Sequence, residues 1–281
     1  MSVHPPAPRV SVVIPTYNRA WSLATALDSV LSQGFEACET IVVDDGSTDG
    51  TPALLAAYDA ALRVIRQPNR GVSAARNAGI RAARAPLVAL LDSDDYWLPG
   101  KLAAQSAFFD QNPEAVICQT EEIWIRNGVR VNAGKRHRKP SGMIFEPSLE
   151  LCLVSPSAVM LRRSLFEAVG FFDERLPACE DYDLWLRIGC RHPVHLIDRP
   201  LIVKRGGHPD QLSRAPGLDR FRIRAICGLL AQNVLTAGQR RAAWEALAAK
   251  CTIYAAGCRK RGRGAEAEDC LALIARFRPQ I

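Results

Sequence analysis

The sequence predicts an α/β protein with a mainly parallel β-sheet flanked by helices, followed by a C-terminal helical extension. Two observations predict this class. Short apolar runs alternate with amphipathic helical stretches over the first hundred residues, and this alternation is typical of a parallel sheet covered on both faces. Beyond residue 218 the chain is rich in Ala, Leu and Arg and reads as helical throughout.

Four strands and the helices between them are expected in the first part of the chain. The strands fall at 10–14, 40–44, 63–67 and 86–92. Leu23, Leu27 and Val30 share one face of a helix after the first strand. Pro52 suits the first turn of the next helix, and a helix of small residues spans 71–83.

The pattern changes after the fourth strand. A helix is expected over 100–111, and the alternating segment around Asn127-Gly128 predicts a β-hairpin. The basic segment 133–142 contains several residues that break regular structure, so we expect a mobile loop. A short strand and a short helix then precede a further helix that begins within 178–190.

Composition excludes several classes of protein. With 48% hydrophobic and 23% charged residues, the chain has a globular balance. No apolar run approaches the roughly 20 residues that span a bilayer, and the N-terminus lacks the features of a secretory signal. Nine cysteines occur without a CxxC pair, which favours reduced thiols. We therefore expect a cytoplasmic protein.

Charge is distributed unevenly along the chain. Residues 1–199 carry 21 Lys and Arg against 23 Asp and Glu, whereas residues 200–281 carry 15 against 6. The last third therefore favours an anionic partner, and a solvated basic helix face is the alternative. Because few aromatic residues interleave with this charge, we expect no nucleic acid. Peripheral contact with the inner face of a membrane, docking onto the main domain and homodimerisation all stay open.

Polar, carboxylate-rich segments follow three of the four predicted strands. They are PTYNR at 15–19, DDGSTDG at 44–50 and DSDD at 92–95. Ligands of an open α/β sheet bind outside the carboxyl ends of its strands, so these segments should converge on one crevice. The sequence has neither a GxGxxG after the first strand nor a GxxxxGK[ST] loop, which counts against dinucleotide and P-loop folds.

The segment DSDD concentrates negative charge where a buried strand ends. In extended backbone Asp92 and Asp94 point the same way, with Ser93 between them pointing away. Mg²⁺ and Mn²⁺ prefer hard oxygen ligands of this kind. The spacing predicts that both carboxylates reach one metal–diphosphate unit, while Asp95 caps the following turn. A solvated turn is the alternative.

Five blocks follow one another in the chain: VSVVIPTYNR, TIVVDDGSTDGT, NRGVSAARNAGI, LVALLDSDDYWLP and CEDYDLWLR. In this order and spacing they resemble glycosyltransferase family 2 of the bacterial type, over about residues 9 to 213. The resemblance implies the GT-A fold, a nucleotide-diphosphate sugar donor, Mn²⁺ or Mg²⁺, and transfer with inversion to a hydroxyl acceptor. Such an acceptor is a saccharide or a lipid-linked molecule in the synthesis of surface polysaccharides, glycolipids or other glycoconjugates.

The resemblance also implies which residues bind the donor. They are Pro15, Thr16, Tyr17, Asn18, Asp45, Arg76, Asp92 and His208. Thr16 and Tyr17 should line the base and ribose pocket, and Asp45 should accept a hydrogen bond from the nucleobase. Arg76 and His208 should reach the diphosphate. A turn aspartate, a surface arginine and a structural histidine are the alternatives. The match of VVDDGS favours a uridine or thymidine donor.

For catalysis the resemblance points to the segment CEDYD. Asp181 matches the base that removes the proton from the acceptor hydroxyl, and Glu180 supports it. Asp94 and Asp92 match the metal ligands, with Asp94 as the direct ligand. Alternatively, Glu180, Asp181 and Asp183 form an acidic first turn that complements the helix dipole.

The expected organisation has three parts. A loose lead covers 1–8, the glycosyltransferase domain covers 9–215, and the helical extension covers 216–281. Within the domain, 9–98 should bind the nucleotide and 99–215 the acceptor. A sugar nucleotidyltransferase is the competing enzyme, but its Gly-rich basic signature is missing from PTYNRA. A non-catalytic nucleotide-sugar-binding protein is the other alternative, and it would be expected to have lost the acidic motifs.

Overall fold

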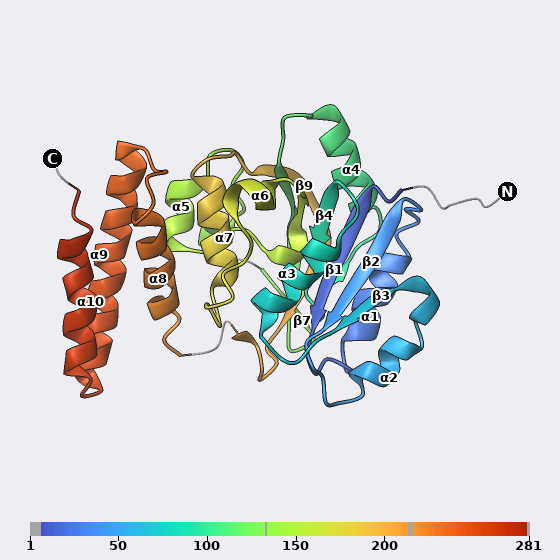
Figure 1. Cartoon of the computed structure of the whole chain (residues 1–281), viewed down its shortest axis with the longest axis horizontal. Coiled ribbons are helices and arrows are strands. Elements are labelled where there is room, and N and C mark those ends of the chain that lie inside the picture. Colours follow the sequence, from blue (N-terminus) through green and yellow to red (C-terminus); the bar gives the residue numbers. More distant parts are fainter. Residues whose placement is uncertain (1–6, 133, 213–215, 280–281) are drawn as a thin grey trace.

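The computed structural model describes residues 7–132, 134–212 and 216–279. Within these ranges one nine-stranded sheet is flanked by helices, and a group of helices lies at one end (Figure 1). The first four strands pair in parallel in the order β3-β2-β1-β4. Their bounds are Val10–Thr16 (β1), Cys38–Asp44 (β2), Arg63–Arg66 (β3) and Leu87–Leu90 (β4).

Helices cover both faces of this parallel half. They are α1 (Leu23–Leu31), α2 (Thr51–Ala56) and α3 (Val72–Ala82). Alternate residues of β1 face opposite sides: Ile14 belongs to the same core as Leu27 of α1, whereas Val13 belongs to the core of Ala75 in α3. All seven residues of β1 are therefore buried, as expected for a parallel strand between two layers of helices. The predicted alternation of strands and helices is confirmed.

The second half of the sheet is mixed, so the sheet is less parallel than predicted. After α4 (Lys101–Gln111) the chain enters β6 (Ile117–Arg126), and β8 (Val159–Arg162) is inserted antiparallel between β4 and β6. β9 (His195–Gly206) runs parallel to β6, and β5 (Tyr96–Trp97) pairs antiparallel with β9.

The predicted hairpin is formed by β6 and β7 (Val129–Val131). Asn127 and Gly128 at its tip have φ angles of 49° and 77°. Positive φ at both central residues is what a two-residue turn of this kind requires, and Asn-Gly tolerates it at low cost.

The expectation of a mobile loop over 133–142 is wrong for Lys139. Its side chain is buried, and its Nζ lies 3.0 Å from Oε2 of Glu122 in β6. The same Nζ donates a hydrogen bond of 3.2 Å to Gln119 Oε1. A basic segment of the sequence looks solvated, but a carboxylate on the neighbouring strand compensates this buried cation. Ala133 lies outside the described residues.

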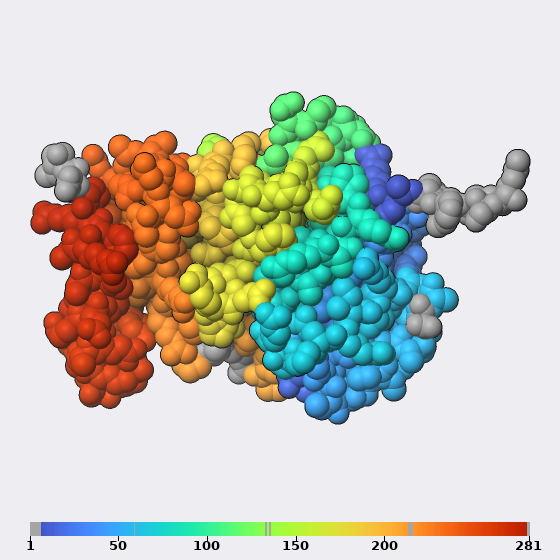
Figure 2. All heavy atoms as spheres, in the orientation of Figure 1, coloured from blue at the N-terminus to red at the C-terminus, as the bar shows by residue number. Residues whose placement is uncertain are grey.

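The C-terminal helical extension is confirmed. It consists of α8 (Asp219–Leu230), α9 (Ala237–Lys260) and α10 (Gly264–Arg276). These helices form a layer at one end of the molecule (Figure 2) and share a core with α5 (Phe145–Glu150) and α7 (Glu180–Gly189), in which Phe145, Tyr182 and Ile226 are buried. None of the helices in the described part of the chain is both long and apolar enough to cross a bilayer.

Candidate active site

A cavity of about 840 Å³ lies at the carboxyl ends of β1, β2 and β4. β6, the end of β9 and the start of α7 also contribute to its walls. All of the predicted site residues except one line it: Pro15, Thr16, Tyr17, Asn18, Asp45, Arg76, Asp92, Asp94, Glu180 and Asp181. The remaining one, His208, contacts a lining residue, because its Nε2 lies 2.9 Å from Oδ2 of Asp94.

Asp45 and Asn18 hold together the loops that follow the first strands. The buried carboxylate of Asp45 accepts hydrogen bonds from the backbone N–H groups of Arg70 at 3.0 Å and Gly71 at 2.8 Å. The side-chain oxygen of Asn18 accepts one from the N–H of Thr48 at 2.8 Å. Asp45 therefore fixes the entry into α3, which is a turn role. Its predicted contact with a nucleobase stays a prediction.

The end of β1 presents two different groups to the cavity. The ring of Tyr17 is 44% exposed. The hydroxyl of Thr16 is buried and has no hydrogen-bond partner among the residues that the structure describes. Buried hydroxyls are normally paired, so this one is suited to a polar group of a bound ligand.

The three aspartates after β4 each have a different partner. Oδ1 of Asp92 lies 2.6 Å from Nη2 of Arg76, and Asp94 pairs with His208. Asp95 is buried and accepts hydrogen bonds from the Ser157 hydroxyl at 2.6 Å and from the backbone N–H of Arg205 at 2.9 Å. The expectation that Asp95 caps the next turn is wrong, because it joins that turn to β9. All three line the cavity, but only Asp92 and Asp94 are partly exposed there.

Burial raises the pKa of Asp94, and the neighbouring charge of Asp92 raises it further, against the opposing effect of Arg19 and His208. Crowded carboxylates of this kind become more favourable when a cation is present. The oxygen donors of Asp92 and Asp94 therefore fit a divalent metal. Within the described residues no group of three or more His, Cys, Asp or Glu side chains is arranged to hold a metal ion. A metal there would need oxygens from a substrate, as Mg²⁺ usually does.

Arg76 of α3 connects the two acidic motifs of the site. Its buried guanidinium donates through Nη2 to Oδ1 of Asp92 and through Nη1 to Oε1 of Glu180, each at 2.6 Å. The ring of Phe172 lies 5.1 Å away. The surface-arginine alternative is wrong, because the side chain is 3% exposed. Arg76 thus holds the end of β4 against the start of α7.

The acidic residues at the start of α7 take separate directions. Glu180 pairs with Arg76, and Asp183 pairs with Arg187 one turn along the helix at 2.7 Å. Asp181 lines the cavity, where Oδ1 accepts a hydrogen bond of 2.7 Å from the Tyr182 N–H. All three residues lie in the first turn of α7, as the alternative expected, and the catalytic role of Asp181 stays a prediction.

The segment after β9 brings further charges to the carboxylates that follow β4. Nδ1 of His208 lies 2.7 Å from Oδ1 of Asp210, and Asp210 pairs with Arg19, which follows β1. The ring of Trp21 lies 5.4 Å from that of His208. His208 is thus placed beside Asp94, and its contact with a diphosphate stays a prediction.

Several lining residues were missed by the sequence interpretation. They are Glu122, Trp124, His137, Lys139 and Cys152. The sulfur of Cys152 lies 3.5 Å from Oδ2 of Asp181. The alternating segment EEIWIR carries a charged and an aromatic residue two positions apart, so Glu122 and Trp124 could have been assigned to one face of a strand. Which face of β6 points into the cavity depends on how β6 pairs with β9, and this pairing is not visible in the local sequence.

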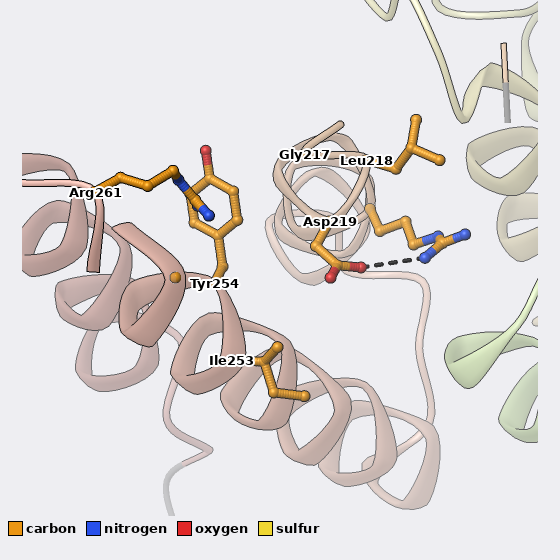
Figure 3. Close-up of a pocket in the computed structure, with 8 residues that line it drawn as sticks. Gly217, Leu218, Asp219, Ile253, Tyr254 and Arg261 are labelled. Atoms are coloured by element: carbon orange, nitrogen blue, oxygen red, sulfur yellow. Dashed lines mark hydrogen bonds and ion pairs between the residues drawn. The ribbon is translucent and has the colours of Figure 1, made fainter. Parts of the chain in front are cut away.

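A smaller hollow of about 320 Å³ lies between the start of α8 and the end of α9. Figure 3 shows the Asp219–Arg222 ion pair on one side of it and Ile253, Tyr254 and Arg261 on the other. None of the predicted site residues lines it. The residues predicted from the sequence therefore meet in the larger cavity.

Comparisons with known sequences give one consistent family. Residues 11–170 match the model described as glycosyl transferase family 2. The uncharacterized protein MT1568 of Mycobacterium tuberculosis is 31% identical over 248 residues, which cover 79% of this chain and 76% of the relative. A relative from Escherichia coli is 30% identical over 182 residues, which cover 64% of this chain and 69% of the relative. It is named UDP-Glc:alpha-D-GlcNAc-diphosphoundecaprenol beta-1,3-glucosyltransferase WfgD. The chain spans about a third of the length of three rickettsial relatives named uncharacterized glycosyltransferases.

Solved structures share the fold. The crystal structure of Staphylococcus aureus TarS 1-349 with UDP-GlcNAc has a TM-score of 0.78 and 19% identity, covering 96% of this chain and 82% of TarS. The structure of the mannosyltransferase PcManGT of Pyrobaculum calidifontis with GDP-Man and Mn²⁺ has a TM-score of 0.60 and 21% identity. The match covers 98% of this chain and 77% of PcManGT. The predicted GT-A fold is confirmed by these similarities.

Proposed function

The chain belongs to glycosyl transferase family 2, and on this basis we propose that it transfers a sugar from a nucleotide-diphosphate donor to a hydroxyl acceptor, with inversion at the anomeric carbon. One observation carries the proposal. A single cavity holds the carboxylates that follow β4 and the acidic pair of α7, and Arg76 joins the two groups.

The donor would occupy the part of the cavity next to β1 and β2. The unpaired hydroxyl of Thr16 and the exposed ring of Tyr17 are available to the nucleoside there. Structures that share the fold hold UDP-GlcNAc and GDP-Man. Asp92 and Asp94 would hold Mn²⁺ or Mg²⁺, which neutralises the diphosphate and stabilises it as it leaves.

Asp181 would act as the base for the acceptor hydroxyl. Inversion in one step requires a single proton acceptor on the acceptor side and no protein nucleophile. The Tyr182 N–H and the Cys152 thiol donate to the two carboxylate oxygens of Asp181. These contacts fix the orientation of the carboxylate in the cavity. Glu180, held by Arg76, supports the start of the same helix.

A donor panel tests the function. The protein is mixed with UDP-, dTDP- and GDP-sugars, each with and without Mn²⁺, and its thermal melting is recorded. At least one nucleotide sugar should raise the melting temperature, and the shift should be larger with metal, because a ligand that binds the folded state stabilises it. The absence of any shift at millimolar nucleotide sugar would contradict the proposal.

The nucleobase is expected to be a pyrimidine. The match of VVDDGS to the family favours uridine or thymidine, and Asp45 and Thr16 both line the cavity. In calorimetric titrations with Mn²⁺, UDP or dTDP should bind more tightly than GDP. A markedly tighter GDP complex would overturn this assignment while leaving the transferase proposal intact.

The basic turn between α9 and α10 is expected to bind anionic membranes. It carries exposed Arg259, Lys260, Arg261 and Arg263, of which Arg259 and Arg263 pair with glutamates. Basic residues near an anionic surface contribute about 1 kcal/mol each. In liposome flotation the protein should float with phosphatidylglycerol vesicles at low salt. Replacing Lys260 and Arg261 with Gln should weaken this binding, and equal flotation with neutral vesicles would contradict it.

A further inference from the structure

One wall of the cavity combines an aromatic platform with positive charge. We call it the β6 wall and define it by Glu122, Trp124, Arg126, His137 and Lys139, all of which line the cavity. In the sheet order β1-β4-β8-β6, two strands separate it from the strand whose end faces the proposed nucleotide. The β6 wall therefore stands away from the nucleotide side.

The β6 wall lines the same cavity as the proposed base. Trp124 is in register with Lys204 of the parallel strand β9. Lys204 and Lys139 of the wall each donate a hydrogen bond of 3.4 Å to the hydroxyl of Ser155. Ser155 and Cys152, the residue that contacts Asp181, belong to one segment that lines the cavity.

The ring of Trp124 is held in a fixed position. Its indole N–H donates a hydrogen bond of 2.6 Å to Oε1 of Glu122, and the ring of His137 lies edge-on at 5.1 Å. Glu122 is in turn anchored by the ion pair with buried Lys139. Trp124 remains partly exposed. A rigid, partly exposed aromatic ring in a polar cavity can contact the C–H face of a sugar ring at a small cost in conformational entropy.

A guanidinium group lies beside this ring. The guanidinium of Arg126 lies 5.4 Å from the centre of the Trp124 ring, and Arg136 and Arg138 are exposed on the adjacent segment. Within the described part of the chain no carboxylate forms an ion pair with Arg126, Arg136 or Arg138. Arginines without carboxylate partners are suited to phosphate and carboxylate groups, which they bind in a bidentate manner.

We propose that the β6 wall is the acceptor subsite and that it takes a saccharide bearing an anionic group. The sugar ring stacks on Trp124, and the phosphate or carboxylate binds Arg126. The acceptor hydroxyl then faces Asp181. This inference rests on the proposed function, since it assigns the second substrate of the same cavity.

Saturation-transfer NMR on the full chain tests the subsite directly. The probes are N-acetylglucosamine 1-phosphate, methyl glucuronide and neutral methyl glucoside, each with and without UDP and Mn²⁺. At low salt, one or both anionic probes should bind at least about tenfold more tightly than the neutral one, a difference of about 1.4 kcal/mol. The phosphate and carboxylate arms identify which anion the site prefers.

Three variants separate stacking from charge. Trp124→Ala should lower the affinity for all sugar probes about tenfold, and Trp124→Phe should restore part of it. Arg126→Gln should remove the preference for anionic probes. Val129→Ala, on the exposed side of the neighbouring strand β7, should match the wild type; Val129 is 65% exposed and does not line the cavity.

The outcomes distinguish this inference from the proposed function. Equal binding of anionic and neutral probes, or unchanged probe binding in Trp124→Ala, overturns the subsite. Failure of the wild type to bind any of the three probes overturns it as well. All of these results leave the melting shift with nucleotide sugars untouched. If nucleotide sugars do not shift the melting temperature of the wild type, the donor assignment is contradicted. The titrations without UDP still measure binding of the sugar probes at the β6 wall.

Discussion

Replacing Asp181 with Asn is expected to lower the rate of sugar transfer by about 10²- to 10⁴-fold, the usual effect of removing a general base. Asn keeps the shape of the side chain and can still accept the hydrogen bond from the Tyr182 N–H. Nucleotide affinity should stay near the wild-type value, because Asp181 belongs to α7, whereas the proposed donor side lies next to β1 and β2. Turnover with the natural acceptor and calorimetry with UDP and Mn²⁺ measure the two quantities separately.

Asp94→Ala provides the contrast. It should weaken metal-dependent nucleotide binding and turnover together, because Asp94 faces the cavity beside Asp92 and His208. Far-ultraviolet circular dichroism checks that both variants fold. Near-normal transfer by Asp181→Asn, or a product that keeps the anomeric configuration of the donor, would exclude the single-displacement mechanism.

The arrangement of the strand ends was accessible from the sequence. The segments after β1, β2 and β4 meet in one cavity, because parallel strands end at the same edge of a sheet. Local spacing was therefore sufficient to bring Thr16, Asp45 and Asp92 together. The strands themselves could be recognised because both faces of the sheet are covered, which leaves nearly continuous apolar runs.

Contacts between distant segments were not accessible. Arg76 and Glu180 are 104 positions apart, and nothing in either local pattern predicts that α3 and α7 meet. Lys139 looked like part of a solvated loop, because its partner Glu122 belongs to a strand whose orientation is set by β8 and β9. Asp95 looked like a cap for the same reason, since its donors, Ser157 and Arg205, lie beyond the local sequence.

The link formed by Arg76 has a cost as well as a role. A buried guanidinium and two carboxylates are removed from water, and their attraction only compensates when all partners are present. Burial raises the pKa of Glu180, and the charge of Arg76 opposes that rise. The charge of Arg76 thus stabilises the ionised form of Glu180. Removing Arg76 leaves a buried carboxylate without its counter-charge.

Arg76→Gln is therefore expected to lower the free energy of unfolding by about 3–5 kcal/mol at pH 7, as measured by urea denaturation. Without Arg76 the folded-state pKa of Glu180 rises further above its ordinary value of about 4.3. The loss of stability caused by the unpaired Glu180 carboxylate is complete at pH values above this folded-state pKa. It becomes smaller as the pH falls from the folded-state pKa toward the ordinary pKa. The stability difference from wild type should therefore narrow on mild acidification.

Two further variants make this result specific to the buried charge. Arg81→Gln, on the exposed part of the same helix, should change stability by no more than about 0.5 kcal/mol, because Arg81 is mostly exposed and its contact with Glu174 is 3.8 Å long. Adding Glu180→Gln to Arg76→Gln removes the unpaired carboxylate and should recover part of the lost stability, a coupling that a double-mutant cycle measures. The contrary outcome is a double variant that loses as much free energy of unfolding as the two single variants lose in sum. In that case Arg76 stabilises the fold by packing against Phe172 and not by joining the two acidic motifs.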